Sequence, residues 1–493
     1  MISTTNFQFF QSLLTKLFSD FTNGALLDNE GNPIHIKYLH LGDISTLPLA
    51  VRTSDQYLQL KDGDMALVND PNSGSIDIFS MTLVLAIEIN LKNKKKTKLF
   101  ITTRVPLKPK IKFTTNNDSL IIPPSPLAQN WILNDELITA ISQHPHCPQD
   151  FISRLRPEIE HLTKQAKTFK TLFSILPFDF NKKFLTQYFD KTKELILDEL
   201  VNQFQYTEVS HTFNIDPDIQ VKLKLEHNKN GLNFNFTGTK ASADFGIPDI
   251  MTLGACKGAL LSFLNPNLPI NAGLLSCSEI TVPKKSFVND STKSSYWAQA
   301  EGTSQIANLV TQSLWALKEN KKPQDFPIHG VSQCSLQLNF GGSKVHFYDS
   351  LEGGTAASPY ANGANALNIW KKDHLKPSIE QIESKFPIRI KNVSLRTKSF
   401  GAGKFSGGLG STKVYELLEP ADLKWINTQI NYHPQGGSGG KHAVGSDITI
   451  LSKDNKKTSL KAYGEMKLQK GDIIMAHSPG GGGYGEQVLD DEE

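Results

Sequence analysis

Cysteine is scarce in this sequence: four of the 493 residues are Cys, and no two of them form a Cys-x-x-Cys pair. Such sparse cysteines exclude a disulfide framework and a zinc ribbon, so we expect reduced thiols in a cytoplasmic protein. An excess of charge of one sign is also missing, because 52 basic and 49 acidic side chains leave a formal net charge of +3. This balance gives no electrostatic reason to expect a nucleic-acid or anionic-membrane partner.

Long hydrophobic runs are missing as well. The most apolar internal run, 81–89, is short and contains Glu88, so we expect a buried strand there and no membrane span. The N-terminus lacks a basic start and a small-residue cleavage site, and its residues Phe10, Leu14 and Phe18 share one helical face. This pattern predicts an amphipathic helix that packs on a core.

Hydrophobic periodicity and turn signals divide the chain into regions of different character. We expect a β-rich N-terminal region (1–130), a helical region (131–207), an α/β region (208–330), a glycine-rich β-dominated region (331–487) and an acidic tail (488–493). The predicted fold class is therefore mixed α/β, of the α+β type.

Glycine is unevenly distributed along the chain. Of the 35 glycines, 12 lie before residue 330 and 23 lie in the last 164 residues. Glycine is required where the backbone takes a positive φ and where two chain segments approach closely. We therefore expect both situations in the C-terminal part.

Four patterns with known functions are present or nearly so, but the sequence around each argues against the corresponding function. The Gly-x-Gly-x-x-Gly pattern at 480–485 matches a dinucleotide site, yet the eight residues that follow are too few for the required helix and second strand. The Gly-x-Ser-x-Gly pattern at 436–440 is not preceded by a convincing strand. Lys441 lacks the other residues of a Walker loop, and the His-Pro-His-Cys run at 144–147 fits a surface turn better than a metal site. We expect this chain to bind no cofactor by these devices.

The order of short segments along the chain is more specific than any of these motifs. The segments are Gly63-Asp64, Asn69-Asp70-Pro71, Ile121-Ile122-Pro123-Pro124, Phe236-Thr237-Gly238-Thr239, Leu268-Pro269-Ile270-Asn271-Ala272-Gly273, Thr303-Ser304-Gln305, Leu351-Glu352-Gly353-Gly354, the glycine-rich run 401–408 and Ser478-Pro479-Gly480-Gly481-Gly482-Gly483-Tyr484-Gly485. In this order the chain resembles the hydantoinase B/5-oxoprolinase family, the B-type subunits of ATP-dependent cyclic-amide hydrolases, to which subunits of acetone and acetophenone carboxylases are related.

The resemblance implies a hetero-oligomer with a hydantoinase A/oxoprolinase-type subunit that binds ATP. An amide carbonyl is a poor electrophile, and phosphorylation of its oxygen turns that oxygen into a leaving group. By resemblance, the B-type subunit supplies a divalent-metal site and part of the pocket for a small-molecule substrate such as 5-oxoproline or a hydantoin. ATP would then be bound by the partner and not by this chain.

The positions that carry the family's metal chemistry differ in this chain. After Asn-Asp-Pro, the family has a histidine where this sequence has Asp77 and an aspartate where it has Ser80, and a second family histidine corresponds to Pro106. Asp20 and His40 are the other remnant candidates for metal ligands. Because a tight divalent site needs three or four converging N, O or S donors, we predict that the metal site is absent.

Two further family segments are altered, which leaves two hypotheses open. The family's His-Met-Thr-Asn-Thr-Arg segment corresponds to 370–375, and the arginine that follows Thr303-Ser304-Gln305 in the family is Ile306 here. By resemblance, Asp77, Thr303, Ser304 and Gln305 are the candidate catalytic residues. Either the chain is an active subunit with a remodelled site, or it is a catalytically degenerate homologue with a structural or regulatory role.

Overall fold

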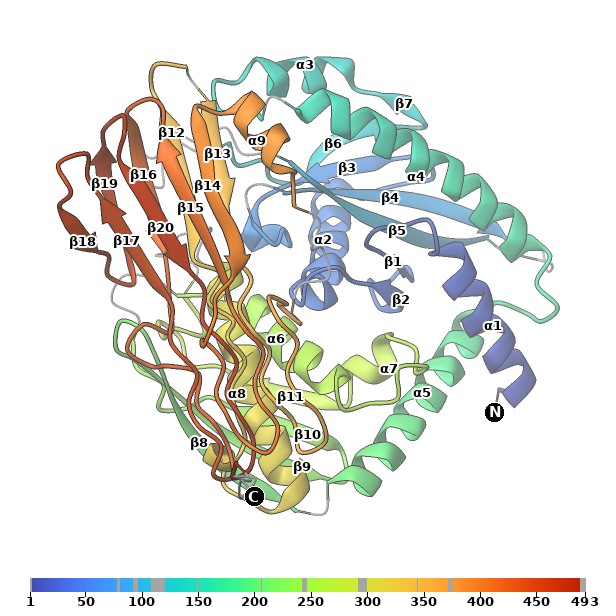
Figure 1. Cartoon of the computed structure of the whole chain (residues 1–493). Coiled ribbons are helices and arrows are strands. Elements are labelled where there is room, and N and C mark those ends of the chain that lie inside the picture. The colour runs from blue at the N-terminus through green and yellow to red at the C-terminus, as the bar shows by residue number, and fades with distance from the viewer. Residues whose placement is uncertain are drawn as a thin grey trace.

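The computed structural model describes residues 2–77, 80–91, 96–107, 120–148, 150–204, 206–241, 246–290, 299–343, 345–370 and 376–487. Its helices and sheets confirm the predicted mixed α/β class. Figure 1 shows an α/β part, formed by the N-terminal and middle residues, beside a β-sandwich formed by the C-terminal residues. The acidic tail, 488–493, lies outside the described residues.

The N-terminal part is built around a seven-stranded sheet with the strand order β2-β1-β5-β4-β3-β6-β7. The strands are β1 (Gly24–Leu27), β2 (Pro33–Lys37), β3 (Met65–Val68), β4 (Ser80–Asn90), β5 (Lys96–Pro106), β6 (Ser125–Gln129) and β7 (Ile132–Leu133). β4 and β5 pair antiparallel over their whole length, so the first residue of β4 lies opposite the last residue of β5. Ser80 and Pro106, which occupy two positions where the resemblance expects metal ligands, therefore lie side by side.

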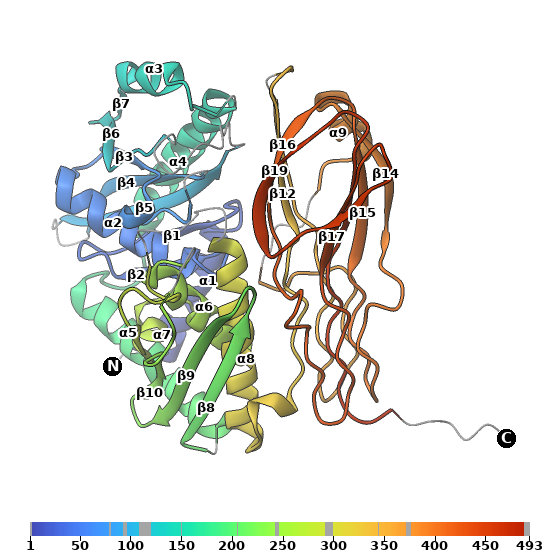
Figure 2. The same ribbon diagram turned by 90° about the vertical axis from the view of Figure 1, so that its left-hand side faces the viewer.

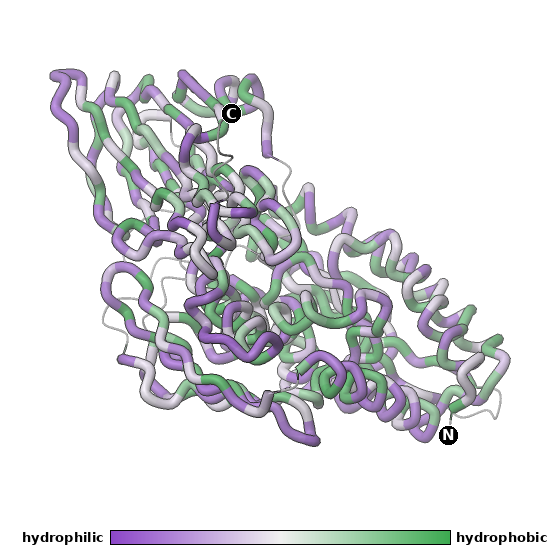
Figure 3. The backbone as a smooth tube through the Cα atoms, turned by 60° about the horizontal axis from the view of Figure 1, so that its bottom comes forward, coloured by the Kyte–Doolittle hydropathy of each residue, from purple (hydrophilic) through white to green (hydrophobic). Residues whose placement is uncertain are grey.

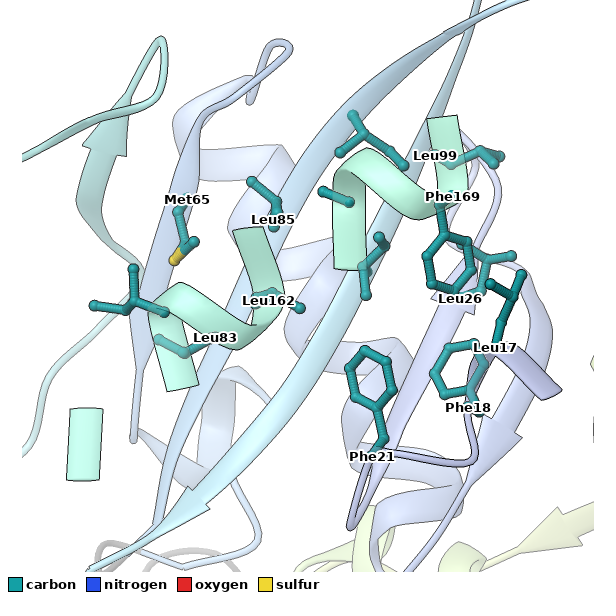
Figure 4. Packing of buried hydrophobic residues seen from close by; sticks show 14 of the residues in the cluster. Leu17, Phe18, Phe21, Leu26, Met65, Leu83, Leu85, Leu99, Leu162 and Phe169 are labelled. Carbon is teal, nitrogen blue, oxygen red and sulfur yellow. The ribbon is translucent and has the colours of Figure 1, made fainter. Parts of the chain in front are cut away.

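Helices cover both faces of this sheet, because successive residues of a strand point to opposite faces. On one face, Leu83 of β4 lies beside Leu162 of α4 (Phe151–Ser174), and Leu17 of α1 (Thr4–Leu17) lies beside Leu26 of β1, as Figure 4 shows. On the other face, Val84 packs with α2 (Asp43–Leu58). The predicted N-terminal helix is confirmed by α1, whereas α2 is a helix inside the region expected to be β-rich.

The middle of the chain adds helices and a second sheet. Helices α3 (Asp135–Gln143), α4 and α5 (Lys182–Gln203) occupy the stretch predicted to be helical. A four-stranded sheet follows, with the order β11-β10-β9-β8, and α8 packs on its β8 edge and against α6. These elements are β8 (Glu208–Ile215), β9 (Ile219–Asn228), β10 (Gly231–Asn235), α6 (Asp249–Leu261), α7 (Ala272–Leu275), β11 (Ser278–Thr281) and α8 (Gln299–Glu319).

The C-terminal part is a sandwich of two antiparallel sheets whose facing side chains form one hydrophobic core. The first sheet contains β13 (Val345–Asp349), β12 (Ser335–Phe340), β16 (Ala421–Ile426) and β19 (Tyr463–Leu468), in that order. The second contains β14 (Ile388–Leu395), β15 (Ser411–Leu417), β20 (Ile473–His477), β17 (Asp447–Leu451) and β18 (Lys457–Ser459). The short helix α9 (Ile379–Lys385) precedes β14 and packs against it.

Long glycine-rich loops leave the sandwich and run alongside α8 (Figure 2). Segment 478–485 is hydrogen-bonded to several of the other loops: Gly481 donates to the carbonyl of Gly408, and Gly354 donates to that of Pro479, both over 2.9 Å. A Cβ atom added to Gly481 would lie 1.8 Å from the carbonyl oxygen of Thr355. Close approach is therefore the main reason for glycine in these loops.

Positive φ explains fewer of the C-terminal glycines than the sequence suggested. The structure describes all 23 glycines from residue 330 onward, and three of them, Gly439, Gly471 and Gly485, have a positive φ. The Gly-x-Gly-x-x-Gly pattern at 480–485 belongs to this packed backbone, and the amides of its glycines donate to carbonyls of neighbouring loops, so they are not free to bind a phosphate.

Hydrophilic and hydrophobic residues alternate along the outer helices in Figure 3, as expected for helices with one buried face. Among the described residues, no helix has the length and apolar character needed to cross a membrane. All four cysteines lie in the described ranges; they are buried, and no disulfide joins them.

Candidate functional site

Two positions where the resemblance expects metal ligands lie where β4 begins and β5 ends. Ser80, the first residue of β4, is the cross-strand partner of Pro106, the last residue of β5. Asp77 lies three residues before Ser80, and its carbonyl oxygen accepts a hydrogen bond from the hydroxyl of Ser75 over 2.7 Å. The two positions where the resemblance expects an aspartate and a histidine ligand thus hold a hydroxyl and a proline ring side by side, neither of which is a usual ligand for a divalent cation.

A buried ion pair lies next to these positions. Nε of Arg104 in β5 is 3.4 Å from Oδ1 of Asp43, the first residue of α2, and both side chains are shielded from solvent. Oδ2 of Asp43 accepts hydrogen bonds from the backbone amides of Leu39 and His40 over 3.0 and 2.9 Å. Nη2 of Arg104 donates to Oγ1 of Thr46 over 3.0 Å. Oδ2 of Asp43 is therefore held by two backbone amides, whereas Oδ1 meets Arg104 through the ion pair alone, since Oδ1 has no hydrogen-bond partner among the described residues.

Electrostatics connects Asp77 to this pair. Burial lowers the pKa of the Arg104 guanidinium, and the negative charges of Asp43 and Asp77 oppose that lowering. A buried guanidinium is the cation of choice where a carboxylate must be neutralised without a metal, because it stays charged and donates several hydrogen bonds. Arg104 therefore supplies positive charge beside Asp77.

The three remnant metal candidates are not equivalent in the structure. His40 and Asp77 both lie beside the Asp43–Arg104 pair, His40 through its backbone amide and Asp77 through its charge. Asp20 is exposed in the turn after α1, where it accepts a hydrogen bond from the hydroxyl of Ser19 over 3.2 Å. The resemblance grouped these three residues, but Asp20 is exposed after α1, whereas His40 and Asp77 are half-buried beside the ion pair, so the three do not form one donor set.

The described residues at this place offer no donor set for a divalent cation. Within the ranges that the structure describes, no three His, Cys, Asp or Glu side chains gather in a way that could hold a metal ion. Residues 108–111, which correspond to the rest of the family's second ligand segment, lie outside the described residues, as do 371–375. The absence of a bound metal stays a prediction that metal analysis must test.

The other predicted candidates lie on α8, beside the glycine-rich loops. Gln305 is buried, and its Nε2 donates to Oγ1 of Thr428 over 2.6 Å. Oγ1 of Thr428 donates in turn to the carboxylate of Glu301, one helical turn before Gln305. Glu301 also accepts from the backbone amide of Gln333 over 3.1 Å, so α8 and two loops share one buried polar network.

Thr303 and Ser304 take no part in that network. The hydroxyl of Ser304 donates to the carbonyl of Ala300 over 2.9 Å, a bond within the helix. The hydroxyl of Thr303 is buried and has no hydrogen-bond partner among the described residues. Among the three residues of the Thr-Ser-Gln motif, Gln305 is therefore the one whose side chain reaches across to the loops in the described structure.

Buried ionisable groups surround this network. Burial raises the pKa of the Glu301 carboxyl, although hydrogen bonds from Thr428 and the amide of Gln333 oppose the rise. Burial lowers the pKa of His329 to about 4, and Nδ1 of this ring accepts the backbone amide of Ala356 over 2.9 Å. His329 is therefore neutral at physiological pH and carries its hydrogen on Nε2.

Sequence reasoning missed the residues that organise the remnant metal position and the α8 network. Asp43 stands directly after the retained His40-Leu41-Gly42, and Arg104 opens the altered family segment. An acidic and a basic residue among apolar neighbours could have indicated a buried ion pair. Glu301 and Thr428 meet only through the tertiary fold, 127 residues apart in the chain. No local pattern could have paired them.

Comparisons with known proteins agree with the fold and the motif order. The family model described as hydantoinase B/oxoprolinase matches residues 109–487. An uncharacterised protein of Methanocaldococcus jannaschii is 26% identical over 94% of this chain and 83% of its own length. 5-Oxoprolinase 1 of Arabidopsis thaliana is 26% identical over 55% of this chain, but the match covers 21% of that enzyme, so the chain corresponds to about a fifth of its length.

Two solved structures share the fold at low sequence identity. The ATP-dependent caprolactamase of Pseudomonas jessenii has a TM-score of 0.77 and 15% identity, covering 98% of this chain and 90% of that chain. A nucleotide-free acetone carboxylase has a TM-score of 0.73 and 12% identity, covering 98% of this chain and 74% of the other. With a family model matching more than three quarters of its residues, this chain belongs to the hydantoinase B/oxoprolinase family.

Proposed function

We propose that this chain is the B-type component of a two-component, ATP-dependent enzyme that opens small cyclic amides, and that it holds no divalent metal of its own. The observation that carries the proposal is that the scaffold of the ATP-dependent caprolactamase is kept over 98% of the chain. The closely packed glycine segments are part of that scaffold, and they leave no room for a side chain.

ATP would be bound by an A-type subunit, since the sequence of this chain has no Walker loop. In the proposed reaction the amide oxygen attacks the γ-phosphorus of ATP and ADP leaves. Water then adds to the activated carbon and the ring C–N bond breaks, which frees the nitrogen and leaves an acyl phosphate; a second water hydrolyses this acyl phosphate to a carboxylate and inorganic phosphate. This chain would bind and orient the ring while its buried loops exclude bulk water.

No step is assigned to a metal in this chain. The charge that a cation would supply near Asp77 comes from Arg104, which is held by Asp43 and Thr46. Because the Arg104 guanidinium is buried and fixed, its proposed role is to preserve the local structure and the local electrostatic potential.

A catalytically degenerate homologue is the second candidate, and one observation favours it. Ser80 and Pro106 occupy neighbouring positions where the family resemblance places two metal ligands. If relatives need those ligands for turnover, a chain without them could retain only the surface that binds the A-type subunit. Its role would then be structural or regulatory.

One experiment separates the two candidates. A tagged copy of the chain is purified from its own cells, and the A-type subunit is sought among the co-purifying proteins. The complex is treated with a chelator, desalted, supplied with MgATP and assayed with 5-oxoproline and with hydantoin. Ring opening coupled to ADP formation supports the enzyme, assembly without turnover supports the degenerate homologue, and failure to assemble contradicts both.

A further inference from the structure

The two edges of the second sandwich sheet carry different side chains. β14 and β18 are the edge strands of this sheet, and Figure 2 shows β14 at the margin of the sandwich that faces away from the α/β part. A free strand edge is a template for pairing with another chain, and proteins block such edges with lysine, proline or a covering segment. The residues whose amides point outward decide whether each edge is blocked.

On β14 the outward residues are Val393 and Leu395. The amide of Arg396 donates to the carbonyl of Gly410 over 2.8 Å, and the pairing with β15 runs without a break over 392–395. Hydrogen-bonded pairs alternate with non-bonded pairs along an antiparallel ladder, so the N–H and C=O groups of Val393 and Leu395 point away from β15. Neither residue bonds to the backbone of another segment in the described part of the chain.

The side chains at these two positions are apolar and exposed. A bulge after Ile390 keeps Val393 and Leu395 on the face of the sheet that the core residue Tyr415 also occupies. Val393 is nevertheless 54% exposed and Leu395 45% exposed. Nearer the start of β14 the edge is covered, because Glu383 of α9 accepts the amide of Ile390 over 2.7 Å. The open part of the edge therefore combines free backbone groups with uncovered apolar side chains.

The opposite edge of the same sheet is blocked. The amide of Leu460 donates to the carbonyl of Ile448 over 2.9 Å, and by the same alternation Lys457 and Ser459 are the outward residues of β18. An outward lysine is a common protection against edge-to-edge pairing. Since β14 has apolar residues at the corresponding outward positions, its open edge is not a general property of the sheet.

We propose that a second copy of this chain pairs with the β14 edge, antiparallel and two-fold symmetric about Ser394. In this register Val393 of each copy lies opposite Leu395 of the other, so the outward backbone groups of all four residues find hydrogen-bond partners. The four apolar side chains meet on one face, and the two five-stranded sheets become one continuous sheet. A two-fold dimer requires a self-complementary surface of this kind.

The charges on β14 fit a second copy as the occupant. Opposite Arg396 the register places Asn392 of the second copy, and opposite Lys391 it places Thr397, so no like charges face each other. Lys391 is also paired with Glu416 of its own chain, at 3.4 Å. A contact of this size lies at the weak end of protein interfaces, so the dimer should form in the micromolar range. The inference does not depend on the proposed function, because the isolated chain carries both halves of the contact.

Sedimentation velocity of the isolated full-length chain, from low to several hundred micromolar, tests the contact. Val393→Pro removes an outward N–H and leaves the bonds to β15 intact. Leu395→Lys gives β14 the kind of protection that β18 has. Ser459→Pro, which removes an outward N–H from β18, is the matched control. The wild type should change from monomer to dimer as its concentration rises, with a dissociation constant at least about tenfold higher in both β14 variants and unchanged in Ser459→Pro.

Disulfide trapping tests the register. Ser394→Cys places the two introduced thiols side by side at the two-fold axis, with Cα atoms about 4.5 Å apart, which is within disulfide reach. Asn392→Cys, on the same face of β14, places them four residues apart along the strands, roughly 13 Å. The four native cysteines are buried. Mild oxidation should therefore give a covalent dimer of Ser394→Cys and leave Asn392→Cys monomeric.

A wild-type chain that stays monomeric at every concentration overturns the proposal. A dimer that both β14 variants leave intact, or equal trapping of the two cysteine variants, overturns it as well. If the isolated chain is monomeric and Val393→Pro instead prevents assembly with an A-type subunit, the edge belongs to that subunit and the second copy is excluded. Circular dichroism establishes that each variant is folded, and Leu395→Lys decides the outcome should Val393→Pro fail to fold.

Discussion

The Asp43–Arg104 pair allows a prediction whose size follows from the structure. Asp43→Asn removes the charge that neutralises the buried guanidinium but keeps an amide oxygen for the backbone amides of Leu39 and His40. Breaking a buried pair from one side typically costs about 3–5 kcal/mol, because a charge is left without its partner. Asp77 also acts on Arg104 and offsets part of that cost, so we expect about 3 kcal/mol for Asp43→Asn.

Asp43→Ala should cost more than Asp43→Asn. It removes the acceptor as well as the charge, and each buried amide left without an acceptor adds about 1–3 kcal/mol. The assay is hydrogen exchange of the peptide around residues 39–46, followed by mass spectrometry, together with the urea unfolding midpoint. A local cost of about 3 kcal/mol corresponds to exchange about a hundredfold faster.

The control for this series is Glu194→Gln, which breaks the exposed Lys191–Glu194 pair on α5 and should leave both readouts unchanged. Equal effects of Asp43→Asn and Glu194→Gln would refute the reasoning. It would show that the guanidinium does not depend on Asp43, and that Arg104 has no fixed electrostatic role beside Asp77.

Three further predictions concern the glycine loops, a buried histidine and the α8 network. Gly481→Ala should lower stability by about 3 kcal/mol, since the added methyl meets the carbonyl of Thr355, whereas Gly341→Ala, with nothing within 4 Å of its Cβ, should change the urea midpoint little. His329 has a pKa of about 4 in the folded chain against about 6.5 unfolded, so its contribution of about 3 kcal/mol is complete above pH 6.5 and is lost as the pH falls toward 4. His329→Asn, which keeps an acceptor for Ala356, should flatten the unfolding curve in that window, and an unchanged pH profile would contradict the assignment. Thr428→Val should destabilise the chain by about 1–3 kcal/mol because it leaves Gln305 and Glu301 without their shared hydroxyl, and calorimetric melting that matches the wild type would contradict the network.

Much of the fold could be predicted because its signals are local. The helix at the N-terminus shows a 3.6-residue apolar period, and the strand around 81–89 is a short apolar run, so both were found in their places. α2 was missed because Pro48 lies inside it and its buried face carries the polar residues Ser45, Thr46 and Ser54, which weaken the apolar periodicity. Tertiary burial, not local preference, holds that helix on the sheet.

The glycine-rich loops show a different limit of sequence reasoning. Glycine was expected there, but the sequence does not distinguish a positive φ from a close approach. The reason becomes visible only when Gly481 is seen against Thr355, which is 126 residues away in the chain.

The candidate site was predicted least completely, because its chemistry depends on residues brought together from distant segments. Alignment with the family pointed to Asp77 and Gln305, and the structure places each beside a buried charge. Glu301 belongs to no motif, and a lone acidic residue in a sequence carries no sign that it will be buried, whereas Asp43 follows the retained His40-Leu41-Gly42 and could have been found there. Asp20, which matches a family aspartate only with a one-residue shift, is exposed at the surface.

The central claim is that this family scaffold operates without the cation that its relatives' pattern implies, with Arg104 supplying the nearby positive charge. Elemental analysis by mass spectrometry of the full chain, purified without chelator from cells supplied with manganese, zinc and iron, tests it most directly. The account predicts divalent metal far below one ion per chain, both in the chain alone and in its complex with the A-type subunit. One tightly held divalent ion per chain, retained through desalting and lost on substitution of Asp77, would contradict it.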